Sequence, residues 1–145
     1  AANDVILVGK GQSELEDDLN RVAKAAGRYV TEENLPENGL FYRADHFSMA
    51  RVGVPVLLMM GIAGGADLVV GGREAGNQWI ADYVGNCYHK PCDAWSDDWD
   101  LTGAVQDIEL FHQLIVELAN SSQWPAWKLG SEFKAVRQQS AAARR

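Results

Sequence analysis

The sequence predicts an α/β fold, in which a mixed and largely parallel sheet is flanked by helices. Short strand-like runs at 5–8, 28–31 and 55–60 alternate with segments of helical periodicity. The run from Pro55 to Met60 is apolar at nearly every position, as strands covered on both faces are. A long amphipathic segment begins at Thr102. This alternation of strand and helix patterns is typical of α/β layers.

The first predicted strand, Val5-Ile6-Leu7-Val8, leads into a helix predicted over residues 13–26. Ser13 is the expected N-cap because Glu16 follows three residues later, which is the spacing of a capping box. Gly27 is expected to end the helix at the C′ position. The inward stripe at helical spacing consists of Leu15, Leu19, Val22, Ala23 and Ala26.

The middle of the chain is predicted to be irregular. After the second strand we expect a loop over 32–39 and a brief extension at 41–43. Asp45 is expected to cap a short helix that ends at Gly53, just before the apolar strand. Residues 61–98 have little periodicity, so they are predicted to form a long loop with at most a short helix at 78–84.

The second long helix is the strongest helical pattern of the chain. It starts at Thr102, and a terminal helix is predicted over 131–143 after an aromatic segment at 124–127. No composition change marks an internal boundary, so residues 1–145 are expected to be one unit. The inward face of the long helix is expected to carry Leu101, Val105, Ile108, Phe111, Ile115 and Leu118.

Composition excludes several classes of partner. The chain has 145 residues, with 13 basic and 20 acidic residues and a net charge of −7. Nucleic acid or an acidic membrane would repel this charge. No apolar run reaches the ~20 residues of a membrane span. Cys87 and Cys92 can be bridged only if their Cα atoms lie within about 7 Å, and a bridge would fit a periplasmic or secreted location.

The segment from Asn86 to Asp93 is the expected centre of chemistry. His89 lies between the phenol of Tyr88 and a Lys-Pro turn, which favours a fixed ring orientation, as a metal ligand requires. Tyr88 is placed to offer a hydroxyl to an oxyanion. From the residues alone, a solvated loop histidine is the commoner role. A structural zinc site at Cys87, His89 and Cys92 is weaker, because such sites usually have four ligands.

The same segment resembles a known family. Residues 88–93, with the aromatic stretch to Trp99 and the helix start at 100–105, are similar to zinc aminopeptidases of family M28. Residues 39–55 resemble the family's Ser-Asp-His-x-x-Phe-x-x-x-Gly-x-Pro block, with Ala44 in place of Ser. Residues 118–133 resemble the tail of one bacterial branch.

The resemblance implies the second half of a zinc-exopeptidase-like fold. It also implies hydrolysis of N-terminal peptide bonds by zinc-activated water, with two zinc ions in the complete enzyme. His89 corresponds to the last metal ligand, and Tyr88 to the residue that stabilises the tetrahedral intermediate. Asp45 and His46 correspond to the pocket wall. Without the resemblance, Asp45 is better explained as a helix cap and His46 as a packing residue.

The resemblance covers only the last part of the family's catalytic domain, and the chain begins at Ala1 without a methionine. The other ligands are expected upstream, so the isolated chain is expected to be inactive, with zinc absent or incomplete. The expected partners are a peptide substrate, the remainder of the catalytic domain and, through exposed apolar surface, a second copy. The alternatives are a non-catalytic binding domain on this fold, or a related carboxypeptidase or glutaminyl cyclase.

Overall fold

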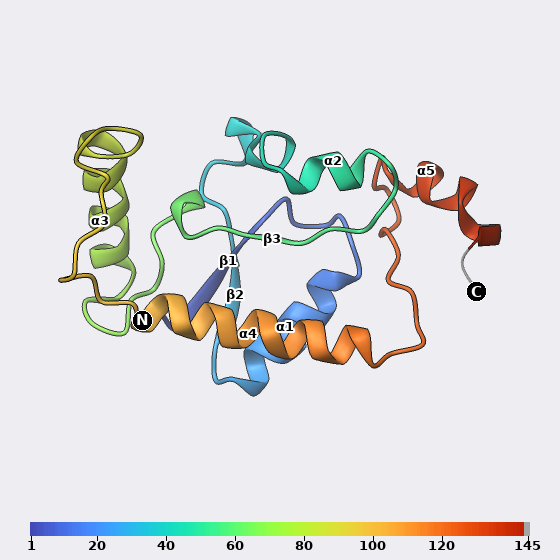
Figure 1. The fold of residues 1–145 in the computed structure, drawn as a ribbon, viewed down its shortest axis with the longest axis horizontal. Helices are drawn as coiled ribbons and strands as arrows, with labels where there is room; N and C mark the ends of the chain where they lie inside the picture. The colour runs from blue at the N-terminus through green and yellow to red at the C-terminus, as the bar shows by residue number, and fades with distance from the viewer. Residues whose placement is uncertain (144–145) are drawn as a thin grey trace.

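The computed structural model describes residues 1–143 and confirms the α/β class. Within them, three strands form one mixed sheet in the order β2-β1-β3. The central strand β1 (Asp4–Val8) pairs in parallel with β2 (Tyr29–Glu32) and antiparallel with β3 (Leu58–Met59). Helices lie on either side of this sheet, as Figure 1 shows.

The hydrophobic core has two halves because the side chains of β1 alternate between the two faces of the sheet. Val5 and Leu7 pack with helices α1 (Leu15–Ala25) and α4 (Thr102–Ala119). The alternate residues of β1 pack on the other face, and that half of the core comprises Ile6, Val8, Phe41, Ala50, Ala63, Trp127 and Phe133. All five β1 residues are buried, as the apolar run at 5–8 predicts.

The expected capping box of α1 forms only in part. The Glu16 carboxylate accepts hydrogen bonds from the backbone N–H groups of Gln12 and Ser13, at 2.6 and 3.0 Å. The Ser13 hydroxyl does not cap the helix, because it donates instead to the carbonyl of Val56 at 3.0 Å. This serine therefore ties the start of α1 to the segment that enters β3.

Three local predictions in the middle of the chain are wrong. Residues 41–43 do not extend, because Leu40–Tyr42 forms a 3-10 turn. Helix α2 (His46–Ala50) forms as expected, but the Asp45 side chain does not cap it. The predicted strand at 55–60 pairs only at Leu58–Met59, and most of its residues are half-buried rather than covered on both faces.

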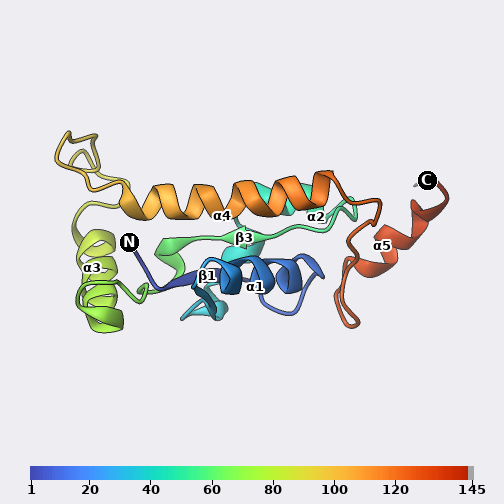
Figure 2. The ribbon, with the colours of Figure 1, turned by 90° about the horizontal axis from the view of Figure 1, so that it is seen from below.

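The largest error concerns the predicted loop at 61–98. The short helix expected at 78–84 is part of helix α3 (Gly72–Asn86), which has 15 residues. Its N-cap Gly71 and its first residue Gly72 have positive φ angles of 87° and 62°. The glycine pair thus forms the turn into the helix. Helix α3 stands at one end of the molecule, apart from the other helices, in both Figure 1 and Figure 2.

Helix α4 forms as predicted, but its inward face is different. Leu110 and Leu114 are each 3 % exposed, and they pack against α1 and β1. Ile108 and Ile115, which the sequence places inward, are 65 % and 59 % exposed. The helix is apolar on two sides, and only the narrower side faces the core of residues 1–143.

The C-terminal part is less regular than expected. Helix α5 covers only Lys134–Gln139, and a 3-10 turn at Ala141–Ala143 follows it. No helix within residues 1–143 has the length and hydrophobicity that a membrane crossing requires.

Two glycines of α3 allow a matched test of its packing. A Cβ at Gly76 would overlap the carbonyl oxygen of Ala66, whereas a Cβ at Gly85 would meet no atom within 4 Å. Gly76→Ala is expected to lower the free energy of unfolding by ~1–3 kcal/mol through overpacking. Gly85→Ala is expected to raise it by up to ~1 kcal/mol through helix propensity. Urea denaturation of both variants checks the pair, and equal effects would contradict it.

Candidate functional site

Helix α3 carries a column of aromatic rings toward its C-terminal end. Trp79 and Tyr83, four residues apart on one face of the helix, stack with ring centroids 5.3 Å apart. Tyr83 makes an edge contact with Tyr88 at 5.7 Å, and Tyr88 stacks on His89 at 3.9 Å. We call these four residues the aromatic column. Its last member is the histidine that the sequence places at the centre of chemistry.

The end of α3 also fixes the backbone beside this column. The N–H groups of Cys87 and Tyr88 both donate to the carbonyl of Tyr83, at 2.9 Å each. The Lys90 N–H donates to the carbonyl of Cys87 at 2.9 Å, which closes a turn around His89. His89 is the one non-glycine residue of the described chain with positive φ, at 58°. This left-handed conformation, which histidine tolerates better than most residues, is supported by the turn.

A disulfide closes the same turn into a six-residue ring. Cys87 and Cys92 are bonded, with their Cα atoms 5.3 Å apart. The pairing that the sequence leaves open is therefore made. Because both sulfur atoms bond to each other, neither is a thiolate ligand, and the structural zinc site at Cys87, His89 and Cys92 does not form. Residues 87–92 are named the disulfide ring below.

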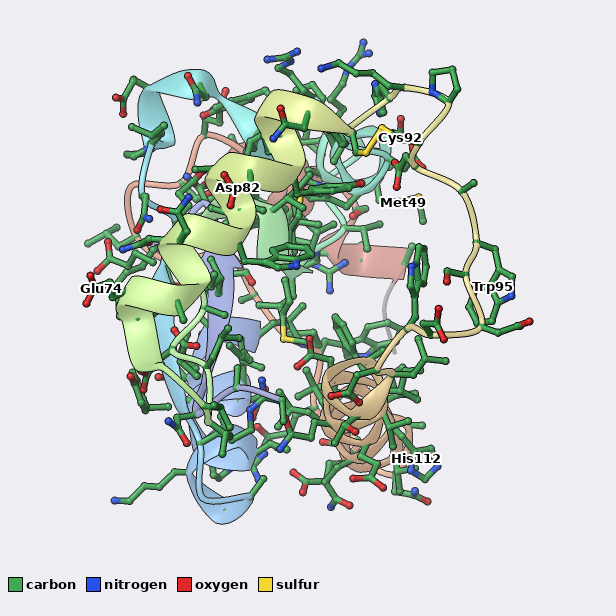
Figure 3. The ribbon with its side chains drawn as sticks, turned by 90° about the vertical axis from the view of Figure 1, so that its left-hand side faces the viewer. Met49, Glu74, Asp82, Cys92, Trp95 and His112 are labelled. Atoms are coloured by element: carbon green, nitrogen blue, oxygen red, sulfur yellow. A yellow bond between two sulfur atoms is a disulfide. The ribbon has the colours of Figure 1, made fainter. Side chains whose placement is uncertain are left out.

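Asp93 lies at the exit of the disulfide ring, where it is held by α3. The Tyr83 hydroxyl donates to the Asp93 carboxylate at 2.9 Å, and this hydrogen bond raises the pKa of Tyr83 above its ordinary value. Beyond this point the chain arches away from α3 past Trp95 and returns to α4 (Figure 3). The disulfide ring is thus fixed at both ends, by the helix and by Tyr83.

A pocket lies beside the disulfide ring. Its volume is about 670 Å³, and both cysteines line it together with Trp79, Tyr83 and Trp99. Of the two tryptophans in the aromatic stretch after the ring, Trp99 lines this pocket and Trp95 does not. Sequence reasoning missed Trp79 and Tyr83, although their spacing of four residues is the signal of one helical face.

Asp45 and His46 lie at the start of α2, where no hydrogen bond, ion pair or ring contact within residues 1–143 joins them to the disulfide ring. Asp45 is exposed. His46 packs edge-on against Phe41 at 4.8 Å, and neither of its ring nitrogens has a hydrogen-bond partner within the described residues. Their role as a pocket wall stays a prediction.

The histidine of α2 gives a testable pH dependence. Burial lowers the pKa of His46 below its ordinary value of 6.5, and the charge of Asp45 opposes this with a smaller effect. Folding thus favours neutral His46, so its stabilising contribution is complete above pH 6.5 and decreases as the pH falls through 6.5 toward the folded-state pKa.

We expect the urea midpoint to fall between about pH 7.5 and about pH 5.5, a range above the titration of most carboxylates. His46→Phe is expected to flatten this dependence because a neutral ring occupies the same space. Exposed His112 on α4 provides the control, and His112→Gln is expected to leave the slope unchanged. The same slope in wild type and His46→Phe would contradict the assignment.

Metal binding needs more ligands than the disulfide ring offers. Protein-bound zinc is held by three or four nitrogen, sulfur or oxygen donors. Within residues 1–143, no group of three His, Cys, Asp or Glu side chains is arranged to hold a metal ion. His89 is exposed, and its ring is held by Tyr88, but it does not by itself fit a pair of zinc ions.

A comparison with protein families places the chain in a class of hydrolases. The sequence pattern of Peptidase family M28 matches residues 1–111, which include β1, α2, α3 and the disulfide ring. This match covers more than half of the chain, and the protein belongs to peptidase family M28. Comparisons with curated proteins and with solved structures gave no match.

Proposed function

We propose that this chain is part of a metallo-aminopeptidase, to which it contributes one metal ligand, His89. The observation that carries the proposal is the presentation of His89 by the disulfide ring and the aromatic column, within a chain of family M28. A fixed imidazole is what a ligand needs in order to bind without a large loss of conformational entropy. In the complete enzyme the reaction would be hydrolysis of the N-terminal peptide bond by zinc-activated water.

Tyr88 is proposed to donate its hydroxyl to the oxyanion of the tetrahedral intermediate. Its ring lies between those of Tyr83 and His89, so its position relative to the ligand is fixed by two aromatic contacts. Asp45 and His46 are proposed to shape the substrate pocket in the complete domain. A peptide is the proposed substrate, and the periplasm or the exterior of the cell the proposed location, which the disulfide supports.

The remainder of the catalytic domain is proposed to cover the outer face of α4. The apolar side chains there, which the described chain leaves about half exposed, are Leu101, Val105, Ile108 and Ile115, with exposed fractions of 46 % to 65 %. Exposed apolar residues in such a row are typical of an interaction surface. In the absence of the remainder, the same face is proposed to cause self-association, which light scattering measures.

The test separates the role of the chain from that of the complete enzyme. The isolated chain is dialysed against trace zinc, its metal content is determined by mass spectrometry, and hydrolysis of an aminoacyl anilide is measured. We expect no stoichiometric zinc and no turnover. In the complete catalytic domain, His89→Ala is expected to remove zinc from one position and to lower kcat/KM by at least ~10³-fold.

Lys90→Ala is the matched control in the complete domain, because Lys90 neighbours His89 in the disulfide ring and its side chain donates to the carbonyl of Gly85 rather than contacting the His89 ring. It is expected to retain zinc and activity. Full activity of His89→Ala would overturn the ligand assignment. Turnover by the isolated chain would overturn the proposal that the metal site is completed by residues outside this chain. A complete domain without zinc or turnover would favour the non-catalytic binding domain.

A further inference from the structure

The pocket beside the disulfide ring combines aromatic faces with negative charge. Trp79, Tyr83 and Trp99 supply the rings, and Trp79 and Trp99 are about half exposed, at 58 % and 51 %. Asp93, Asp98 and Asp100 supply three carboxylates, and the described residues that line the pocket include no Lys, Arg or His. A volume of about 670 Å³ is enough for a large side chain.

The three carboxylates differ in what they already bind. Asp93 accepts the Tyr83 hydroxyl, and Asp100 accepts the N–H and the hydroxyl of Thr102 at 2.9 and 2.5 Å. These bonds to Thr102 lower the pKa of Asp100, with a smaller effect of the chain's amino terminus, so Asp100 stays ionised. No donor within residues 1–143 binds the carboxylate of Asp98, which leaves it available to a ligand.

We infer that this pocket binds the side chain of an arginine residue in a peptide. A guanidinium ion stacks on tryptophan faces through cation–π attraction, and its planar array of N–H groups matches carboxylates. An uncharged aromatic ligand would contact the rings but would gain no attraction from the three carboxylates. Lysine fits the charge but is more strongly hydrated and stacks less well, so its binding is weaker.

The position of the pocket connects it to peptide cleavage, and this part of the inference rests on the proposed function. Cys87 and Cys92 line the pocket, and His89 is two residues from Cys87 in the same ring. Two residues span at most about 7 Å, so the wall of the pocket at Cys87 lies close to the proposed ligand His89. The pocket thus gives the peptidase a preference for a basic residue close to the cleaved bond.

Binding is tested on the isolated chain, which requires neither metal nor turnover. The ligands are Nα-acetyl-arginine amide and its neutral isostere Nα-acetyl-citrulline amide, and the readout is the indole N–H signals in ¹⁵N NMR spectra. Trp79→Phe and Trp99→Phe assign the two indole signals. We expect saturable shifts of both signals with the arginine ligand, with a Kd on the order of 1 mM that increases with salt.

The matched variants are Asp98→Asn and Asp97→Asn, which change the net charge equally at neighbouring positions. Asp97 accepts the indole N–H of Trp95 and does not line the pocket. Asp98→Asn is expected to weaken arginine binding about three- to fivefold, the effect of one exposed charge pair, and Asp97→Asn to leave it unchanged. Trp99→Leu is expected to weaken it further, since it removes one stacking face.

Equal binding of the arginine and citrulline ligands would overturn the inference, as would equal weakening by the two aspartate variants. Absence of shifts at Trp79 and Trp99 would overturn it as well. A metal-free chain that binds arginine supports the pocket even if the proposed peptidase function fails. Conversely, an active complete enzyme without arginine preference would refute only the specificity.

Discussion

Asp4→Ala is expected to lower the free energy of unfolding by about 3 kcal/mol, since it breaks a buried ion pair and leaves its partners unpaired. Asp4 is 1 % exposed in the central strand β1. Its carboxylate accepts hydrogen bonds from the Thr31 hydroxyl at 2.6 Å, the Asp67 N–H at 2.8 Å and the Arg73 guanidinium at 2.6 Å. Arg73 is partly exposed and can regain water, which places the effect near the lower end of the range for such pairs.

Urea denaturation of Asp4→Ala and Asp4→Asn measures the effect, and the second variant keeps the fold testable if the first does not fold. Asp67→Asn is the control, because that carboxylate accepts its side-chain hydrogen bonds from Asn3 and Tyr29 near the surface. We expect a change below about 1 kcal/mol for it. Equal destabilisation by Asp4→Asn and Asp67→Asn would show that Asp4 has no special role.

Trp127→Ala is expected to lower the free energy of unfolding by ~3–5 kcal/mol, as much as Asp4→Ala or more. Trp127 is 2 % exposed, its ring lies 4.8 Å from that of Phe133, and its indole N–H donates to the carbonyl of Gly53 at 3.0 Å. The substitution removes a large buried side chain and leaves that carbonyl without its donor. Residues 124–139 are therefore expected to detach from the sheet.

One further substitution separates the contribution of the Trp127 ring from that of its hydrogen bond, and a second serves as a surface control. Trp127→Phe keeps most of the apolar volume but removes the indole N–H. It is expected to lower the free energy of unfolding by about 1–2 kcal/mol. Trp124→Ala is the surface control, since Trp124 is 58 % exposed and makes mainly a cation–π contact with Arg137 at 5.9 Å, so we expect less than about 1 kcal/mol. Thermal unfolding of the three variants ranks them by the stability that each substitution removes. Equal effects of Trp124→Ala and Trp127→Ala would contradict the burial argument.

The elements with simple periodicity could be predicted from the sequence. The run at 5–8 is a buried strand, and the predicted stripe is the inward face of α1 from Leu15 to Ala23, because both patterns report a single burial environment. Ala26, which the sequence also places inward, is exposed at the C-cap. Helix α3 is predicted only in part, at 78–84, because glycines usually interrupt helices, whereas the glycines at its start are accommodated by the local structure. Gly71 and Gly72 form its entry turn, and Gly76 lies against Ala66.

The face of α4 shows a second limit. Its apolar residues form two stripes, and the sequence favours the longer one with Ile108 and Ile115, whereas the described core contacts Leu110 and Leu114. Periodicity identifies apolar faces but does not say which of two faces another segment covers.

The candidate site also has a part that the sequence indicates and a part that only the structure shows. The sequence singles out the turn around His89, but the contacts that hold this turn come from Tyr83 on α3, a helix of which the sequence predicts only residues 78–84. The disulfide forms because the Cα atoms of Cys87 and Cys92 lie close together in space, and the spacing of the two cysteines in the sequence does not determine that distance. Whether Asp45 and His46 act on the same substrate stays a prediction, because no contact in residues 1–143 connects them to the disulfide ring.

The anchoring of α3 has a mechanical consequence for the histidine at its far end. The bonds from Arg73 to Asp4 and to the carbonyl of Gly65 hold the first turn of the helix against the sheet. From Arg73 to Asn86 the helix rises about 20 Å, so it is a lever with its pivot at the sheet. A tilt of roughly 3° at the pivot moves the far end by about 1 Å, a displacement that costs an active site on the order of 10²-fold in rate. The accuracy with which the proposed ligand His89 would meet its metal is therefore set at the buried carboxylate of β1.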